Sequence, residues 1–338
     1  MEDYLAIFID EEYPDFLDKY TTTSTLKRLK YVTQFCGCDY TKLYSPLFKY
    51  TRFNHSLVVA HMTWHFTHDK KETIVALLHD IGTPCFAHTI DLFLGDAINQ
   101  ESSERNIVGI LEKDKQLINF LEEDKVSLDD FKDYSNFHIL ENKSPNLCTD
   151  RLDGVLHTCY VWLHTHSLEQ IKEVYDDIVV LENSSGIPEI GFKTKTIAEK
   201  FVQMVYIYAH ELQGNTDKYI TKYISELVKI SHEKGLISLD DLYTKKESDL
   251  CKIFKQNFKS WKYFVNAETI SRSDTEPKNS YFISFDTKKR NAIPLIKLEN
   301  ENESKRIDTV SEYAQKLYSQ LKTEKDTKYG YIGNIYNF

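Results

Sequence analysis

An adjacent histidine and aspartate at the end of an apolar segment place the strongest constraint on how this chain folds. His79 and Asp80 close the run TIVALLHDIG, whose apolar side chains occupy every side of a predicted helix. Such a helix is buried all round, and two polar side chains buried at its end carry a large free-energy cost unless something compensates them. A divalent metal does so directly, because imidazole and carboxylate are ligands that it accepts.

Two further ligands for such a metal stand in suitable settings elsewhere in the chain. His55 lies in TRFNHSLVVA, at the start of an amphipathic helical pattern, and Asp150 lies in NLCTDRLDGVLHT, within another one. Three separate helices can converge on one point in the core of a bundle. We therefore expect one metal site with the ligands His55, His79, Asp80 and Asp150. Taken singly, His55 is also explained as a helix residue bonded to the backbone, and Asp150 as a helix cap or an ion-pair partner.

The spacing of apolar residues predicts a mainly α-helical fold. Apolar residues recur at intervals of three and four from about residue 10 to 240, and glycine (11) and proline (7) are scarce in a chain of 338 residues. The segment SSGIP at 184–188 is interpreted as a connector between two helical blocks. We expect a helical domain over residues 1–245 and a small C-terminal lobe over residues 246–338.

The C-terminal lobe has a different texture. WKYFVNAETI and SYFISFDTKKRNAIPLI alternate and are rich in β-forming residues, which predicts a small sheet. The charged turn LENENESKR separates it from an amphipathic helix, VSEYAQKLYSQLK. The final KYGYIGNIYNF is interpreted as a tail or a docking arm.

Charge and composition exclude several functional classes. The formal net charge of −10 argues against strong nucleic-acid binding, which needs a dense surface of lysine and arginine. Neither a secretory signal nor an apolar run of about 18 residues is present in the sequence, so we expect a cytoplasmic protein without a membrane span. The six cysteines form no CxxC pair, which favours reduced thiols.

Three of these motifs resemble a known family. TRFNHS, ALLHDIGTPCFAH and TDRLDG are similar to the HD superfamily of metal-dependent phosphohydrolases, in particular to its deoxynucleoside triphosphate triphosphohydrolase branch, that of the SAM-and-HD-domain enzyme. KKRNAIPLI followed by a helix resembles the C-terminal lobe of that branch, so the similarity spans roughly residues 30–320. The resemblance implies an HD-domain helical bundle with a small α+β lobe, a homo-oligomer, and hydrolysis of a nucleotide or another phosphorylated small molecule. It also implies one divalent metal, and Mg, Mn, Fe, Co and Zn all suit two histidines and two aspartates.

By position, the resemblance also assigns residues around the metal. Arg52 and Arg151 match basic residues that contact substrate phosphates, as guanidinium groups do well. His88 and Asp91 match residues near the reacting phosphate, where His88 and Asp80 would manage the proton. The alternatives are a surface ion pair for either arginine and a buried structural role for His88.

The chain departs from the family pattern at the substrate side of the site. Thr83 stands where the family has a second histidine, and Gln100 stands in place of the histidine of a His-Glu pair. Gly154 and Thr158 replace a tyrosine and an aspartate that hold the sugar. Because Gly154 lies one helical turn after Asp150, we expect a more open pocket beside the metal. Thr83, Gln100 and Gly154 are therefore assigned to the substrate side, and deoxyribose specificity does not carry over.

Three alternative functions remain open at this point. A diiron oxygenase on the same scaffold would need further histidine ligands between Asp80 and Asp150. A nucleotide-binding regulator would hold metal without turnover, and a phosphodiesterase or nucleotidase acting on a different nucleotide is a third reading. His61, His65 and His68 have the spacing of a zinc-binding face, but His61 lies about 120° around the helix from His55 and cannot join the same site.

Overall fold

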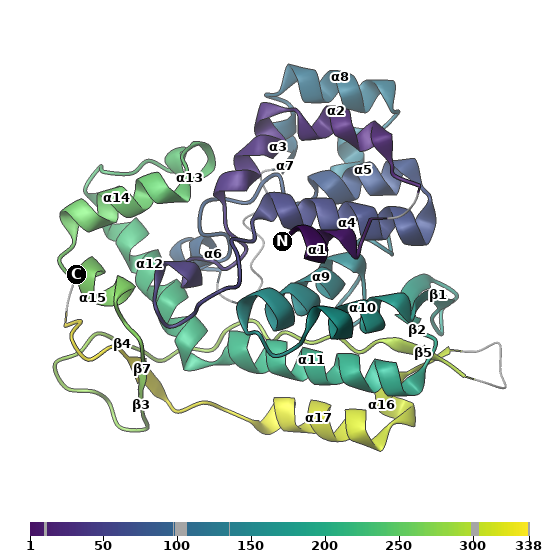
Figure 1. Cartoon of the computed structure of the whole chain (residues 1–338). Helices are drawn as coiled ribbons and strands as arrows, with labels where there is room; N and C mark the ends of the chain where they lie inside the picture. The colour runs from purple at the N-terminus through teal and green to yellow at the C-terminus, as the bar shows by residue number, and fades with distance from the viewer. Residues whose placement is uncertain (10–11, 97, 99–106, 135, 299–303, 337–338) are drawn as a thin grey trace.

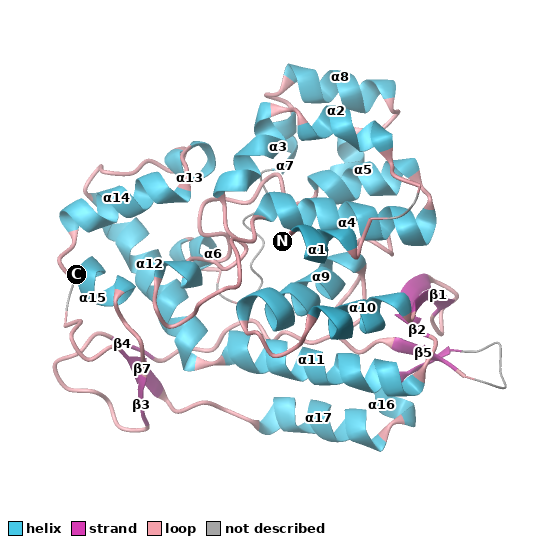
Figure 2. Ribbon diagram, viewed as in Figure 1, coloured by secondary structure: helices cyan, strands magenta, loops and turns pink. Residues whose placement is uncertain are grey.

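The computed structural model describes residues 1–9, 12–96, 98, 107–134, 136–298 and 304–336. Helices dominate these residues, and the strands form two small sheets at the edges of the helical body (Figures 1 and 2). The α-helices are α1 Glu2–Ala6, α2 Asp18–Thr21, α3 Ser24–Arg28, α4 Arg52–Thr67, α5 Lys70–Leu78, α6 Thr89–Phe93, α7 Ile107–Leu111, α8 Lys115–Glu123, α9 Thr149–His157, α10 Leu168–Asp176, α11 Lys195–Gln213, α12 Asn215–Glu233, α13 Asp241–Thr244, α14 Glu247–Asn257, α15 Trp261–Val265, α16 Ile307–Val310 and α17 Glu312–Thr323. The strands are β1 Ile178–Glu182, β2 Pro188–Phe192, β3 Ser271–Ser273, β4 Phe282–Ile283, β5 Leu295–Lys297, β6 Ser304–Arg306 and β7 Tyr329–Tyr331.

The helical pair α4 and α5 is built by local capping. Thr51 and Asn54 form a reciprocal capping box at the start of α4, and His68 ends this helix in a left-handed conformation at φ 48°. Asp69 then caps α5 by accepting the backbone N–H of Glu72 at 2.8 Å. Because α5 runs back along α4, the start of α4 and the end of α5 lie at the same end of the pair.

Hydrogen bonds to α4 and α5 fix the position of α9. The buried carboxylate of Glu72 accepts the backbone N–H groups of Ile139 at 3.1 Å and Leu140 at 2.9 Å. Thr149, the first residue of α9, donates its N–H to the carbonyl of Ile139 at 2.8 Å, and its hydroxyl lies 3.0 Å from that of Thr63 on α4. Each of these buried polar groups is satisfied, so the start of α9 is held against α4.

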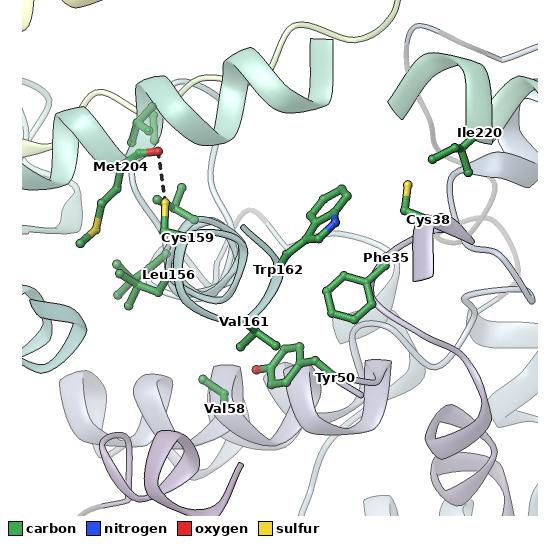
Figure 3. Packing of buried hydrophobic residues seen from close by; sticks show 14 of the residues in the cluster. Phe35, Cys38, Tyr50, Val58, Leu156, Cys159, Val161, Trp162, Met204 and Ile220 are labelled. Carbon is green, nitrogen blue, oxygen red and sulfur yellow. Dashed lines mark hydrogen bonds between the residues drawn. The ribbon is translucent and has the colours of Figure 1, made fainter. Parts of the chain in front are cut away.

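The larger of two apolar cores lies between α4, α9, α11 and α12. Figure 3 shows part of it, where Phe35 and Trp162 face each other with ring centroids 5.6 Å apart. Cys159 donates its thiol to the carbonyl of Met204 on α11 at 3.6 Å. Cys159 and Trp162 belong to a π-helical turn, Thr158–Trp162, that continues α9. The second core lies around α5, α7 and α8.

Two expectations about local structure are wrong. The predicted connector at 184–188 is the turn of a hairpin, because β1 and β2 pair antiparallel on either side of it. WKYFV was expected in a strand and forms α15, where Trp261 and Phe264 pack into the core. Tertiary packing overrides the β preference of these aromatic residues.

The C-terminal part of the chain adds to both sheets. β5 pairs parallel with β2, so the sheet β1-β2-β5-β6 contains strands from both sides of the expected boundary at residue 245. The expected last helix is α17, which packs along α11 in Figure 1. The final segment supplies β7, the central strand of the sheet β3-β7-β4. The expected mainly α fold with a small α+β region is confirmed.

Two properties expected from the sequence concern the whole chain. All six cysteines are unpaired. Among the residues that the structure describes, no helix has the length and apolarity needed to cross a bilayer.

Candidate metal centre

The four expected metal ligands lie close together: His55 is on α4, His79 and Asp80 directly follow α5, and Asp150 is on α9. The ligand atoms of His55, His79 and Asp80 all lie within 4.8 Å of one another. Oδ1 of Asp150 lies 3.0 Å from Nε2 of His55 and 3.6 Å from Nε2 of His79, and Oδ2 of Asp80 lies 3.7 Å and 3.9 Å from the same two nitrogens. The ligand atoms of His55, His79 and Asp80 therefore form one group, and the Asp150 carboxylate adjoins it through its contacts with the two imidazoles.

The hydrogen bonds of the two histidines use Nδ1 and leave Nε2 available to bind a metal. Nδ1 of His55 lies 2.6 Å from the Asp153 carboxylate, and Nδ1 of His79 lies 2.7 Å from the carbonyl of Ala76. Both partners are acceptors, so each Nδ1 donates a proton and each Nε2 is left facing the other ligands, where a metal would take its lone pair. Nε2 of His79 is buried without a hydrogen-bond partner. A divalent cation fits this donor set and satisfies the buried nitrogen.

Asp153 anchors His55 through a buried network that the sequence reasoning did not identify. Its side chain is fully buried and also accepts the hydroxyls of Tyr4 at 3.2 Å and Tyr50 at 3.0 Å. The ring of His157 stacks on Tyr50, with centroids 5.0 Å apart. The only signal in the sequence was the second aspartate of TDRLDG, because it lies one turn from Asp150 on a predicted helix.

The charges at the centre shift the pKa values of its members in opposite directions. Burial alone would lower the pKa of His55, but its hydrogen bonds to Asp150 and Asp153 raise it to about 10. Burial would raise the pKa of Asp153, but hydrogen bonds from His157 and His55 lower it to about 2. The pKa of Asp150 is likewise well below its usual value, against the effect of burial, because His55 hydrogen-bonds to it and the imidazole of His79 lies close by. Without metal, the centre therefore holds protons on its imidazoles.

Arg52 and Thr83 both contact the Asp80 carboxylate. Arg52 donates from Nη1 to Oδ2 at 2.7 Å, and Thr83 donates its hydroxyl to Oδ1 at 3.0 Å. Arg52 lines the cavity described below, as expected of a substrate contact. Thr83 was expected on the substrate side of the site. In the structure its side chain is 1% exposed and does not line that cavity, and its hydroxyl instead orients Asp80.

His88 lines the cavity described below, as the candidate ligands do, and contacts Asp91. Nδ1 of His88 lies 3.0 Å from Oδ2 of Asp91, whose side chain is buried behind it and does not line the cavity. Burial lowers the pKa of His88 to about 4, with further lowering by the charges of Arg290 and Arg52 and an opposite effect of Asp91. A neutral His88 that donates from Nδ1 to Asp91 keeps an acceptor lone pair on Nε2.

The four candidate ligands, Arg52 and His88 line a cavity of about 400 Å³. Gly154 and Thr158 line it, and the expected open space beside Gly154 is present, because a Cβ placed there would approach only the Tyr208 hydroxyl, at 3.8 Å. Thr158 donates its hydroxyl to the carbonyl of Gly154 at 2.7 Å. Gln100, expected on the substrate side, lies outside the described residues.

Arg151 lines the cavity, but its guanidinium bonds to the segment at 141–146. It donates to the carbonyl of Asn146 at 2.8 Å, to the carboxylate of Glu141 at 2.9 Å, and to Asn142. Three basic residues that the sequence reasoning did not assign also line the cavity: Lys288, Lys289 and Arg290. Their signal was the KKR triplet, which was interpreted only as part of the C-terminal lobe.

The remaining histidines with ligand-like spacing, His61, His65 and His68, lie outside the candidate ligand groups. Among the described residues, the candidate ligand groups are the one above and Glu141, Cys148 and Asp150, and neither contains His61, His65 or His68. In the second group, the Arg151 guanidinium already forms an ion pair with Glu141. His138 lines a separate cavity.

The comparisons with known proteins agree with this fold. No family model matches the chain. The uncharacterized protein YdhJ of Bacillus subtilis is 23% identical over 235 residues, which are 67% of each chain. The crystal structure of a phosphohydrolase from Bacteroides thetaiotaomicron is similar with a TM-score of 0.64 at 13% identity, and the match covers 97% of each chain. A hypothetical protein from Aquifex aeolicus has a TM-score of 0.55 at 14% identity, with 94% of this chain and 92% of that one covered. Over nearly its whole length the chain therefore shares its fold with the solved structure of a phosphohydrolase.

Proposed function

We propose that this chain is a metal-dependent phosphohydrolase that acts on a nucleotide or a related phosphate ester or anhydride. One observation carries the proposal. The buried, unpartnered Nε2 of His79 faces His55, Asp80 and Asp150 at the wall of a cavity that five lysine and arginine side chains of the described chain also line. A phosphate group needs both features, a cation site and fixed positive charge.

His55, His79, Asp80 and Asp150 would hold the cation. When bound, a divalent metal polarises a phosphoryl oxygen and lowers the pKa of a water molecule. His88 lines the same cavity as these ligands and keeps an acceptor nitrogen, and we assign it the removal of a proton from the attacking water.

The experiment is a joint measurement of metal content and turnover. The purified chain is loaded separately with Mg, Mn, Fe, Co or Zn, and its metal is quantified by elemental analysis. Release of phosphate, pyrophosphate or triphosphate is then followed with nucleoside mono-, di- and triphosphates and with p-nitrophenyl phosphate. We expect one metal per chain and hydrolysis of at least one substrate.

Two variants sharpen this test. His79→Ala is expected to lose the metal and to lower the rate at least about a hundredfold. His210→Gln alters an exposed histidine on α11 and is expected to behave as the unmodified chain. Absence of bound metal at any concentration would overturn the proposal.

A second candidate is a nucleotide-binding regulator that does not turn over its ligand. The observation in its favour is Thr83, which takes the place of a histidine and donates its hydroxyl to Asp80. A threonine does not deliver a proton as an imidazolium does. Metal and nucleotide binding without product release under all five metals would favour this candidate.

A further inference from the structure

The backbone between Asp80 and His88 adopts a conformation that few side chains tolerate. Residues 81–87, which we call the connecting turn, join Asp80 to His88, the N-cap residue of α6. Phe86 and Ala87 have φ angles of 62° and 45°, in the left-handed region that residues other than glycine rarely adopt. Both residues are buried. Two such residues in succession are stable only where the surrounding structure fixes them.

A buried carboxylate on α14 fixes the end of the connecting turn next to His88. Glu247 is fully buried, and its Oε1 accepts the backbone N–H of Phe86 at 2.8 Å. Its Oε2 accepts the Tyr40 hydroxyl at 3.2 Å. The ring of Phe86 stacks on that of Phe254 in the same helix, with centroids 5.9 Å apart. Helix α14 therefore holds both the backbone and the side chain of this left-handed residue.

The segment that precedes Glu247 bonds to the same end of the connecting turn. Cys85 donates its N–H to the carbonyl of Leu242 at 2.8 Å and its thiol to the carbonyl of Lys245 at 3.1 Å. This segment therefore sets the path along which the chain approaches His88.

A guanidinium group holds the other end of the connecting turn. Nη2 of Arg28, the last residue of α3, donates to the carbonyl of Ile81 at 3.0 Å and to that of Thr83 at 2.7 Å. Thr83 in turn donates its hydroxyl to Oδ1 of Asp80 at 3.0 Å and its N–H to the carbonyl of Asp80 at 2.9 Å. Hydrogen bonds from a charged donor are stronger than neutral ones. Arg28 therefore holds the residue that orients a candidate metal ligand.

We infer that Glu247 and Arg28 are positioning residues for the proposed reaction. Glu247 fixes the backbone that presents His88 to the cavity, and Arg28 holds Thr83 and, through it, the Asp80 carboxylate. The inference rests on the proposed function and adds two residues that are not among the described lining residues of the cavity. Both act by geometry, because a displacement of about 1 Å at a reacting group can cost on the order of a hundredfold in rate.

The test of Glu247 compares two substitutions of one side chain. Glu247→Gln keeps an oxygen that accepts the Phe86 N–H, whereas Glu247→Leu removes it at similar volume. With p-nitrophenyl phosphate, or the nucleotide hydrolysed fastest, as substrate, Glu247→Leu is expected to lower kcat about tenfold or more and to leave KM within about twofold. Glu247→Gln is expected to keep most of kcat. Leu250→Ala, at a buried position of the same helix, is the control: it should lower the thermal unfolding midpoint and keep kcat.

A spectroscopic signature tests the position of His88 without turnover. Histidine-selective proton–carbon NMR spectra of the metal-free chain identify the His88 ring signal by its absence in His88→Gln. Glu247→Leu is expected to move this signal, whereas Glu247→Gln and Leu250→Ala are expected to leave it in place. An unmoved signal or an unchanged kcat in Glu247→Leu would overturn the role of Glu247. A signal that depends on Glu247 in a chain without turnover supports the positioning of His88 and contradicts the hydrolase.

A milder variant covers the case in which Glu247→Leu does not fold, as judged by its thermal unfolding midpoint. Tyr40→Phe removes one hydrogen bond to Glu247 and keeps the carboxylate. It is expected to move the His88 signal less and to lower kcat about two- to fivefold. No change in either quantity would overturn the role of Glu247.

The test of Arg28 is metal affinity, measured by competition with a coloured chelator. Arg28→Met removes both hydrogen bonds to the connecting turn and is expected to lower the affinity about tenfold, as loss of a group that supports a ligand does. Arg28→Lys keeps a donor, is expected to lose less, and replaces Arg28→Met if that variant does not fold. Lys27→Met removes an exposed charge from α3 and should leave the affinity unchanged. Unaltered metal affinity in the folded Arg28 variant would overturn the role of Arg28.

Discussion

Nδ1 of His55 on α4 lies 2.6 Å from the carboxylate of Asp153 on α9. Asp153 lies one helical turn after Asp150 on that helix. One short helix, α9, therefore supplies both a candidate metal ligand and the group that orients another ligand. The Asp153 carboxylate in turn accepts two buried tyrosine hydroxyls. A fixed carboxylate behind a ligating imidazole sets its tautomer and makes it a better ligand.

Asp153→Asn is expected to weaken metal binding without removing a ligand. An amide side chain holds His55 less well, so metal affinity should fall about 10- to 100-fold. Competition with a coloured chelator measures this affinity. Tyr50→Phe removes one hydrogen bond to Asp153 but keeps the carboxylate, and a smaller decrease is expected. Equal affinity of the Asp153→Asn variant and the unmodified chain would show that Asp153 has no positioning role.

Arg151→Lys separates a structural role from a phosphate contact. Lysine keeps the charge but cannot bond at once to Glu141, Asn142 and Asn146. We expect the free energy of unfolding to fall by about 1–3 kcal/mol, measured by denaturant titration. Arg272→Lys, on an exposed arginine paired with Asp326, serves as the control and should change little. A raised KM with unchanged stability would instead support the phosphate contact that the family resemblance implied.

Gly154→Ala tests the open space beside the centre. The added Cβ meets only the Tyr208 hydroxyl at 3.8 Å, and alanine is the better helix former within α9. The free energy of unfolding should rise by about 0.5–1 kcal/mol. Gly154→Tyr should fill part of the cavity and raise KM for nucleotide substrates. An unchanged KM in that variant would show that the substrate does not use this space.

Glu247→Gln is expected to alter how stability depends on pH. The Glu247 carboxylate, on α14, accepts the backbone N–H of Phe86 at 2.8 Å, and burial raises its pKa from 4.5 to about 7. The folded chain binds this proton more tightly than the unfolded chain, so the stabilisation is present below pH 4.5 and is lost as the pH rises through 7.

The measurement is urea denaturation at a series of pH values between 4.5 and 7. The Glu247→Gln variant should show a smaller decrease in the free energy of unfolding across this interval than the unmodified chain. Glu268→Gln, at an exposed position, is the matched control and should keep the original slope. Identical slopes in all three proteins would mean that Glu247 titrates alike in both states.

The sequence alone determined the helical class and the four candidate ligands. Helical periodicity is a local property, and the apolar surroundings of His79 and Asp80 made an unpaired polar pair costly before any contact was known. The motifs around His55 and Asp150 indicated the other two candidate ligands. The hairpin at 184–188 and the helix α15 were predicted wrongly, because long-range packing decides such short segments.

Only the tertiary structure decided how charge is distributed around the cavity. It directs Arg151 to residues 141–146, turns Thr83 towards Asp80, and brings residues 287–292 to the same cavity as His55. The first two join residues within ten positions of one another, whereas the third joins segments far apart in the chain. No local pattern indicates which of several nearby partners a side chain takes, or which distant segments share a cavity, because both are fixed only when the helices pack.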